Sequence, residues 1–326
     1  MTLHPAVAAC RRGVRRDLAD LSPGAVVVVA CSGGADSLAL VAATVFEARE
    51  AGWRVVGATV DHGLQEGSRE LAERVVGQMA GLGADETVTA TVQVEGGGLG
   101  VEAAAREARY AVLAEIAARL GADAVLLGHT RDDQAETVLL GLTRGSGGRS
   151  LAGMRRAFEV FRRPLLDVTR AETEAACAAE GIDVWEDPHN ADPRFTRARV
   201  RATVLPMLER ELGPGVAETL ARTADQLRLD MELLDAVADD ALAGLAEPPP
   251  TASLAALPTA IRRRVLRLLA LRAGAPASEL FHQHVLAVEG LVTDWRGQRW
   301  VDLPGHLRAL RRDDTLLFDR APAPTD

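Results

Sequence analysis

The sequence contains no lysine, and all 37 of its basic residues other than histidine are arginine. A pyridoxal Schiff base, a lysyl-AMP intermediate and a Walker-type phosphate loop each need a lysine amine, so these mechanisms are excluded. Cysteine is scarce as well, since only Cys10, Cys31 and Cys177 occur and none belongs to a CxxC pair. A disulfide framework, a zinc ribbon and a cysteine-ligated iron–sulfur cluster therefore lack a ligand set within this chain.

Long apolar segments are also missing. The longest runs, such as residues 25–31, are far shorter than the roughly 18 residues that a membrane-spanning helix needs. The beginning of the sequence shows no apolar stretch followed by a small-residue cleavage site. We therefore expect a cytoplasmic protein that is neither inserted into a membrane nor secreted.

What is present fits a folded protein of 326 residues, of which 48% are hydrophobic and 25% charged. The length predicts two domains, at about 150 residues each. The net charge is −9, yet residues 251–312 hold ten arginines and only four acidic residues. This segregation indicates either a basic surface that meets phosphates or simply solvated helix faces in a protein that uses arginine for every cation.

The first half of the chain alternates β-branched runs with helical patterns. The runs cover residues 25–31, 53–60, 87–94 and 123–129, and the helical patterns cover residues 36–50, 68–82, 101–120 and 132–142. Four such units in series predict an α/β fold with a doubly wound parallel sheet. A weaker strand at 158–166 and a helix at 170–180 complete the prediction. Ligands of such sheets bind beyond the carboxyl ends of the strands, so the site is sought there.

Later segments predict the domain boundaries. Residues 186–201 have the character of an ordered loop that enters a helix, and residues 216–245 form a long acidic helical pattern that ends at the proline run 247–250. Residues 298–319 predict a small hairpin or mixed unit. We expect a catalytic domain over 1–214, an acidic connecting helix with its proline-rich boundary over 215–250, and a smaller, basic, mainly helical C-terminal domain over 251–326.

The most informative motif is the hexapeptide SGGADS between the first strand and the first helix of this pattern. It consists of Ser32, Gly33, Gly34, Ala35, Asp36 and Ser37. Adjacent glycines let backbone N–H groups approach an anion, and the N-terminus of the following helix adds positive potential. Because lysine is absent, the cationic counterpart must be Mg²⁺ or an arginine, and Asp36 is placed to help hold the metal. The alternative is a plain glycine turn with a helix cap, but the strand-to-helix setting favours a phosphate cradle.

The hexapeptide resembles the SGGxDS signature of the PP-loop ATP pyrophosphatases. That resemblance implies that ATP is cleaved between its α and β phosphates to adenylate a carbonyl-type oxygen. Further motifs follow in order, namely VDHGL (60–64), EAAAREARY (102–110), LGHTRDDQAETVLLGLTRGSG (127–147), RPLL (163–166) and DPHNADPRFTRARVR (187–201). Together they resemble the tRNA(Ile)-lysidine synthase family over residues 26–201. The C-terminal third resembles that family only in its position and basic character.

Acidic residues gather in the motif that follows the fourth run. Thr130 and Asp133 have the spacing of a helix cap, and Asp132 and Glu136 lie at i and i+4 on one face. Such carboxylates can hold an ammonium group or a metal, although acidic first turns are also common in ordinary helices. The position after a parallel strand, beside His129, favours a site. With the resemblance, we expect Asp132, Asp133 and Glu136 to bind the substrate lysine and Asp133 to serve also as a metal ligand.

The helical pattern at 101–120 carries the arginine that we expect to meet phosphate. Arg106 forms a surface ion pair with Glu102 in the alternative interpretation. The resemblance implies that Arg106 contacts the phosphates or the developing pyrophosphate charge, and in the absence of lysine some arginine must do so. For Arg109 the sequence favours neither a surface charge nor a phosphate contact. We expect His129 to join the phosphate contacts, and the resemblance places His62 near the adenosine, although a loop or core histidine fits His62 equally well.

Two groups of arginines are expected to contact RNA. They are Arg194, Arg197, Arg199 and Arg201 near the end of the catalytic domain, and Arg262 and Arg263 in the basic C-terminal segment. Solvated surface charges are the alternative interpretation for both groups. We favour contacts of the first group with tRNA phosphate or with the adenylate.

The resemblance implies a two-step reaction that uses ATP and Mg²⁺. The C2 oxygen of the wobble cytidine of a tRNA(Ile) with a CAU anticodon attacks the α-phosphate, and the amine of free L-lysine then displaces AMP. Asp36, Arg106 and Asp133 are the expected catalytic residues, which act by positioning and charge neutralisation. The sequence does not decide whether the protein forms a homodimer.

Three rival functions are compatible with parts of this pattern. A tRNA thiolase of the same superfamily shares the phosphate loop but needs cysteines, and the absence of a CxxC pair counts against it. An amidotransferase-type synthetase needs a glutaminase module, which nothing in the sequence resembles. A non-enzymatic ATP-binding regulator stays open until turnover is measured.

Overall fold

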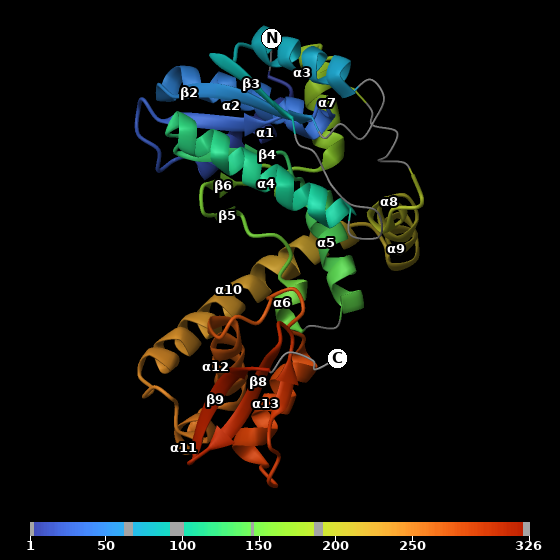
Figure 1. Cartoon of the computed structure of the whole chain (residues 1–326). Helices are drawn as coiled ribbons and strands as arrows, with labels where there is room; N and C mark the ends of the chain where they lie inside the picture. Colours follow the sequence, from blue (N-terminus) through green and yellow to red (C-terminus); the bar gives the residue numbers. More distant parts are fainter. Residues whose placement is uncertain (1–2, 62–67, 92–100, 145–146, 186–191, 322–326) are drawn as a thin grey trace. The chain divides into compact units, whose positions relative to one another are not determined.

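The computed structural model describes residues 3–61, 68–91, 101–144, 147–185 and 192–321 (Figure 1). Two compact units are present. One comprises Met1–Thr143 with Gly153–Ala224, and the other comprises Arg144–Ala152 with Asp225–Asp326. The predicted site residues of the strand-and-helix pattern all belong to the first unit.

A six-stranded sheet forms the centre of the first unit. Its strands are β1 (Val26–Ala30), β2 (Arg54–Asp61), β3 (Glu86–Thr91), β4 (Ala124–Leu127), β5 (Ala157–Phe158) and β6 (Phe161–Arg162). The order across the sheet is β3-β2-β1-β4-β6-β5, and every neighbouring pair is parallel except β5 with β6. The prediction of an α/β fold built on a parallel sheet is therefore confirmed.

Helices cover both faces of this sheet. The helices of the first unit are α1 (Pro5–Asp17), α2 (Ala35–Ala51), α3 (Ser68–Leu82), α4 (Val101–Leu120), α5 (Arg131–Arg144), α7 (Arg170–Glu180), α8 (Thr196–Arg199) and α9 (Leu205–Leu212). Val27 and Val29 of β1 pack toward α1, α2, α3 and α7, whereas Val28 packs toward α4. Because both sides of β1 are buried, its sequence is a continuous apolar run rather than an alternating one.

The order of the strands creates the crevice in which ligands of such folds bind. From β1 the chain passes to β2 and β3 on one side and returns to β4 on the other, so β1 lies between β2 and β4. Ala30 at the end of β1 pairs with Leu127 at the end of β4. The segments that follow these two strands therefore leave the same edge of the sheet side by side, at the topological switch point.

The second unit has its own core. It contains α6 (Gly148–Leu151), α11 (Thr251–Ala256), α12 (Thr259–Arg272), α13 (His282–Thr293), β7 (Val301–Leu303), β8 (Leu307–Arg312) and β9 (Thr315–Arg320), and α10 (Val216–Ala243) contributes to both units. Strands β7, β8 and β9 form an antiparallel sheet. Val265, Leu266 and Leu291 are buried in this core with Ala309.

Some elements differ from their predictions. The single strand predicted at 158–166 is a short hairpin instead, because Glu159 adopts a positive φ of 49° and turns the chain between β5 and β6. The segment 196–212 contains α8, a π-helical turn at Val200–Val204 and α9. Helices α1, α6, α11 and α13 had no counterpart among the predicted elements. Within the described part of the chain, no helix combines the length and the apolar character needed to cross a bilayer.

Candidate active site

The hexapeptide forms a tight loop between β1 and α2. Ser37 donates its hydroxyl proton to the Gly34 carbonyl over 2.9 Å and lies 3.1 Å from the Ser32 amide, whose N–H it accepts. Gly33 adopts a φ of +85°, which side-chain-bearing residues rarely tolerate, and a Cβ there would lie 2.8 Å from Cγ2 of Val75. The loop is thereby held in a curl at the N-terminus of α2, an arrangement suited to an anion.

A second glycine brings the segment after β4 against this loop. A Cβ on Gly128 would lie 3.0 Å from Cα of Ser37 and 3.1 Å from the carbonyl oxygen of Asp36. No side chain fits between backbones at this distance. Gly128 therefore lets the segment that carries His129 and Thr130 lie directly beside the phosphate loop.

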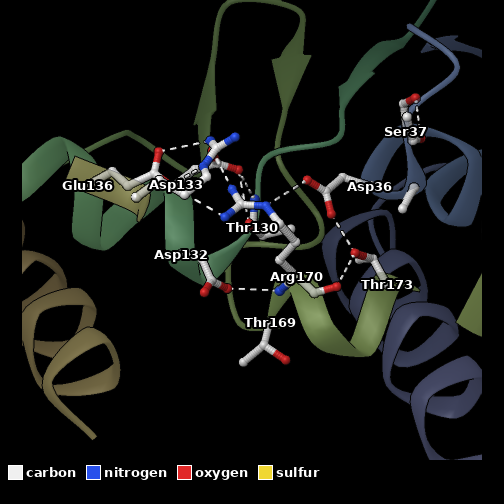
Figure 2. A network of polar contacts seen from close by, with 12 residues as sticks. Asp36, Ser37, Thr130, Asp132, Asp133, Glu136, Thr169, Arg170 and Thr173 are labelled. Atoms are coloured by element: carbon white, nitrogen blue, oxygen red, sulfur yellow. Dashed lines mark hydrogen bonds and ion pairs between the residues drawn. The ribbon is translucent and has the colours of Figure 1, made fainter. Parts of the chain in front are cut away.

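Asp36 is oriented by helix α7. The Thr173 hydroxyl donates to Oδ1 of Asp36, and Nε of Arg170 lies 3.7 Å from Oδ2 (Figure 2). Burial raises the pKa of Asp36 to about 6, against the lowering effect of the Thr173 hydrogen bond, and the neighbouring Asp133 carboxylate adds to the rise. Asp36 is thus a carboxylate that its own surroundings leave poorly neutralised.

Asp133 and Glu136 both contact the same three arginines, which are Arg170, Arg197 and Arg201. Glu136, which has no exposed surface, accepts from Nε of Arg197 at 2.8 Å, from Nε of Arg201 at 2.7 Å and from Nη1 of Arg170 at 3.3 Å. Oδ1 of Asp133 accepts from all three guanidinium groups at 3.1–3.4 Å (Figure 2). Two carboxylates and three guanidinium groups therefore form one network, which we call the acid–arginine network.

The remaining oxygen of Asp133 accepts from the backbone N–H and the hydroxyl of Thr130, both at 2.9 Å. Asp133 thus caps the start of α5, as the spacing predicts. Burial opposes ionisation of this side chain, but Arg170 and Arg197 outweigh burial and hold its pKa at about 2. Asp132, by contrast, is half-buried, and its one described partner is the backbone N–H of Arg170, at 2.8 Å.

These contacts bear on which residues fit a magnesium ion. Mg²⁺ is bound in proteins by one or two carboxylates together with substrate phosphates and water. Asp36 beside the phosphate loop fits that pattern. Both oxygens of Asp133 already accept several hydrogen bonds, so its participation requires at least one arginine to leave Oδ1. Among the described residues, no three His, Cys, Asp or Glu side chains form a metal site by themselves.

His129 contacts an arginine that follows β6. Its Nδ1 accepts from Nε of Arg163 at 3.2 Å, so the neutral ring carries its proton on Nε2. Burial lowers the pKa of His129 to about 3, despite the opposing effect of Asp133. Arg106 donates to the Tyr110 hydroxyl at 3.1 Å. His129 is therefore suited to donate a hydrogen bond and not to accept a proton at neutral pH.

The structure brings together most of the predicted catalytic and ligand-binding residues, at the carboxyl edge of β1 and β4. His62 lies outside the described residues. The predicted RNA-contacting arginines are divided: Arg197 and Arg201 point into the acid–arginine network, whereas Arg194 and Arg199 are exposed. In the second unit, Arg262 and Arg263 both pair with Glu289, at 2.9 and 2.8 Å.

Three further residues at this edge had no predicted role. Arg170 and Thr173 belong to the first turn of α7, and Arg163 follows β6. The TRAE sequence at 169–172 is a local signal for a helix start, and Thr169 and Glu172 do form a capping box. That signal locates the helix, but the contacts of its side chains with Asp36 and Glu136 depend on the packing of α7 against α2 and α5.

Comparison with known proteins agrees with this architecture. Residues 11–208 match the family model described as PP-loop domain, and residues 250–317 match the one described as TilS substrate binding domain. The tRNA(Ile)-lysidine synthase of Thermobifida fusca (strain YX) is 54% identical over 318 residues, which span 96% of this chain and 97% of that protein. The tRNA(Ile)-lysidine synthase of Salinispora tropica is 53% identical over 321 residues, 96% of each chain.

Among solved structures, the U34-tRNA thiolase NcsA from Methanococcus maripaludis, with its [4Fe-4S] cluster, is similar with a TM-score of 0.57. The similarity covers 68% of this chain and 79% of that one at 17% sequence identity. At this identity the likeness concerns the fold alone. All three cysteines of the present chain are buried.

Proposed function

This chain belongs to the tRNA(Ile)-lysidine synthase family, and we propose that it ligates free L-lysine to C2 of the wobble cytidine of a tRNA(Ile) with a CAU anticodon. ATP is converted to AMP and pyrophosphate in the process. The observation that carries the proposal is the curled SGGADS loop at the start of α2, with the Asp36 carboxylate beside it. The near full-length identity to lysidine synthases supports the choice of substrate.

In the first step the C2 oxygen of the cytidine forms a bond to the α-phosphorus of ATP. The bond from that phosphorus to the oxygen bridging the α and β phosphates breaks, and pyrophosphate leaves with the electron pair. The backbone N–H groups of residues 32–37 and the N-terminus of α2 hold the phosphates. A ring oxygen leaves readily only after it has become a phosphate ester, which explains why ATP is needed.

Charge neutralisation in this step falls to groups other than lysine. Mg²⁺, when bound beside Asp36, offsets negative charge on the phosphate oxygens. His129 donates from Nε2, and Arg106 presents a guanidinium group at the same edge of the sheet. Thr173 and Arg170 contact the Asp36 carboxylate and orient it.

In the second step the amine nitrogen of lysine bonds to C2 of the cytidine. The bond between C2 and the former carbonyl oxygen breaks, AMP departs with that oxygen, and the nitrogen releases a proton to water. We assign the binding of lysine to Asp132, Asp133 and Glu136, which hold it as an ammonium ion until it loses one proton to water and can attack as the amine. Asp132 is the most available of the three, because Asp133 and Glu136 are occupied by arginines.

For RNA binding we assign the exposed Arg194 and Arg199 and the basic C-terminal part, with Arg263 more exposed than Arg262. Residues 1–214 would then form the catalytic domain, 215–250 the connecting segment and 251–326 the tRNA-binding domain. Arg197 and Arg201 serve RNA only if they leave the acid–arginine network. The reaction requires tRNA, lysine and ATP, which meet in the cytoplasm.

Incorporation of labelled lysine into RNA tests this function. The full-length protein is incubated with ATP, Mg²⁺, labelled lysine and a tRNA(Ile) transcript that carries the CAU anticodon. A transcript with uridine in place of the wobble cytidine is the control. We expect label in the first RNA alone. ATP cleavage without transfer of lysine would refute the lysidine assignment, and the absence of both would leave an ATP-binding regulator.

A further inference from the structure

A second group of three arginines contacts Tyr110, and all three lie close enough to His129 to lower its pKa. Arg106 and Arg163 each donate from Nη2 to the Tyr110 hydroxyl oxygen over 3.1 Å. The guanidinium carbon of Arg109 lies 6.0 Å from the centre of the Tyr110 ring. We call Arg106, Arg109 and Arg163 the tyrosine-linked arginines.

These arginines lack the counter-charge that the other arginines of the site possess. Among the described residues, none of the three forms an ion pair with a carboxylate, whereas Arg170, Arg197 and Arg201 all do. Arg163 is only 5% exposed. Guanidinium groups stay ionised in proteins, so the protein holds buried positive charge here at a cost in free energy.

Burial and mutual repulsion make the positive charge of these arginines costly. Burial lowers the pKa of Arg109 and of Arg163, and repulsion from Arg106 contributes at both positions. The Nδ1 atom of His129 accepts from Arg163, so its Nε2–H remains a donor for another group. The Phe158 ring lies under the Arg163 guanidinium at 4.7 Å and fixes its plane. Arg163 also donates from Nη1 to the Arg155 carbonyl, so each of its three nitrogens has one protein acceptor and the second N–H of Nη1 and of Nη2 is left for a ligand.

Chain neighbours connect this set to the phosphate loop. Arg106, Arg109 and Tyr110 lie in the first half of α4, His129 follows β4 and Arg163 follows β6, and all three arginines lie close enough to His129 to lower its pKa. Gly128, the residue before His129, packs against the backbone of Asp36 and Ser37. The tyrosine-linked arginines are therefore connected to the phosphate loop through His129 and Gly128.

We propose that Arg109 and Arg163, oriented by Tyr110 and acting with Arg106, form a binding site for the pyrophosphate group that ATP releases. This inference rests on the proposed function, because pyrophosphate is a product only if ATP is cleaved at its α-phosphate. Planar guanidinium groups bind phosphate oxygens in pairs, and a polyphosphate carries enough charge to neutralise several of them. The burial of Arg163 favours a small polyphosphate over the RNA backbone, which needs a solvent-facing surface.

Binding of inorganic pyrophosphate to the full-length protein tests the proposal. Isothermal titration calorimetry with Mg²⁺ present compares wild type with Arg109→Met, Arg163→Met and Tyr110→Phe. Arg119→Met is the matched control, since Arg119 is exposed on the same helix, α4. We expect the arginine variants to bind pyrophosphate about tenfold to a hundredfold more weakly and Tyr110→Phe about threefold to tenfold more weakly. The control should agree with wild type within about twofold.

Filter binding of tRNA to the same variants distinguishes a site for pyrophosphate from a site for the phosphates of the RNA backbone. The proposal expects unchanged tRNA affinity. Unchanged pyrophosphate affinity in Arg109→Met and Tyr110→Phe would overturn it, and so would a loss confined to tRNA. If circular dichroism shows that Arg163→Met does not fold, the pyrophosphate affinities of Arg109→Met and Tyr110→Phe still test the proposal. Wild-type lysidine formation is measured in parallel, because its failure would refute the proposed function and leave the binding result to stand alone.

Discussion

Thr173 donates its hydroxyl proton to Oδ1 of Asp36, although 137 positions separate the two residues in the chain. The hydroxyl reaches Asp36 because α7 packs beside α2, and both residues lie in the first turns of their helices. The orientation of the carboxylate beside the phosphate loop therefore depends on a helix that the loop motif does not include.

Removal of this hydroxyl should weaken the response to Mg²⁺. A hydrogen bond to a charged group contributes about 1.5–3 kcal/mol, so Thr173→Val should raise the Mg²⁺ concentration for half-maximal pyrophosphate release about tenfold or more. Thr173→Ser keeps the hydroxyl and should stay close to wild type. Equal Mg²⁺ dependence in the valine variant and wild type would show that the contact has no functional role.

Asp36→Asn should increase stability while it abolishes adenylation. The folded-state pKa of Asp36 is about 6, above its ordinary value of 3.8, so the folded protein binds the proton more tightly than the unfolded chain does. The ionised form therefore destabilises the fold progressively as pH rises from about 4 to 6, and fully above that. At one pKa unit per 1.4 kcal/mol, the variant should gain about 1–3 kcal/mol at pH 7.5 and nothing near pH 3. Thermal unfolding at both pH values checks the sign.

Three glycines of the loop region should respond differently to alanine. A Cβ at Gly128 meets backbone at 3.0 Å, and Gly33 has both a positive φ and a contact of 2.8 Å, whereas a Cβ at Gly34 meets only Ser32 Oγ at 3.9 Å. Gly33→Ala and Gly128→Ala should lose about 1–3 kcal/mol of unfolding free energy. Gly34→Ala should retain stability and instead lose ATP affinity, because the added methyl group has room in the folded loop but lies within the segment that we assign to phosphate. Urea unfolding and ATP titration of the three variants give the comparison.

Glu136→Gln should be strongly destabilising. The change leaves Arg170, Arg197 and Arg201 around a buried amide, and breaking a buried ion pair costs about 3 kcal/mol or more. Glu115→Gln, at an exposed position of α4, is the control and should remain within about 0.5 kcal/mol of wild type. If urea unfolding shows that Glu136→Gln loses no more unfolding free energy than Glu115→Gln, the three arginines must be solvated by water once the carboxylate is removed.

The local patterns of the sequence identify the sheet, the phosphate loop and the capping Asp133, because each depends on residues within a few positions of one another. Asp36 and Asp133 are recognisable for the same reason. The strand at 158–166 was predicted wrongly, since nothing in the residue type of Glu159 demands a positive φ.

Local sequence patterns do not predict which side chains contact these residues. Arg170 and Thr173 come to Asp36 through the packing of α7, and Arg163 comes to His129 through the pairing of β6 with β4. Arg197 and Arg201 lie in a run of charges that is typical of a solvated surface, yet both side chains reach the fully buried Glu136. Contacts between distant segments decided each of these roles.

The most direct test of the central claim is the stoichiometry of products from ATP labelled in both its α- and γ-phosphates. The full-length protein is supplied with Mg²⁺, lysine and the CAU transcript, and the products are resolved by thin-layer chromatography. The account predicts AMP and pyrophosphate in equal amounts, each matched by one lysine joined to RNA. Formation of ADP and orthophosphate, or AMP without lysine in the RNA, would contradict it.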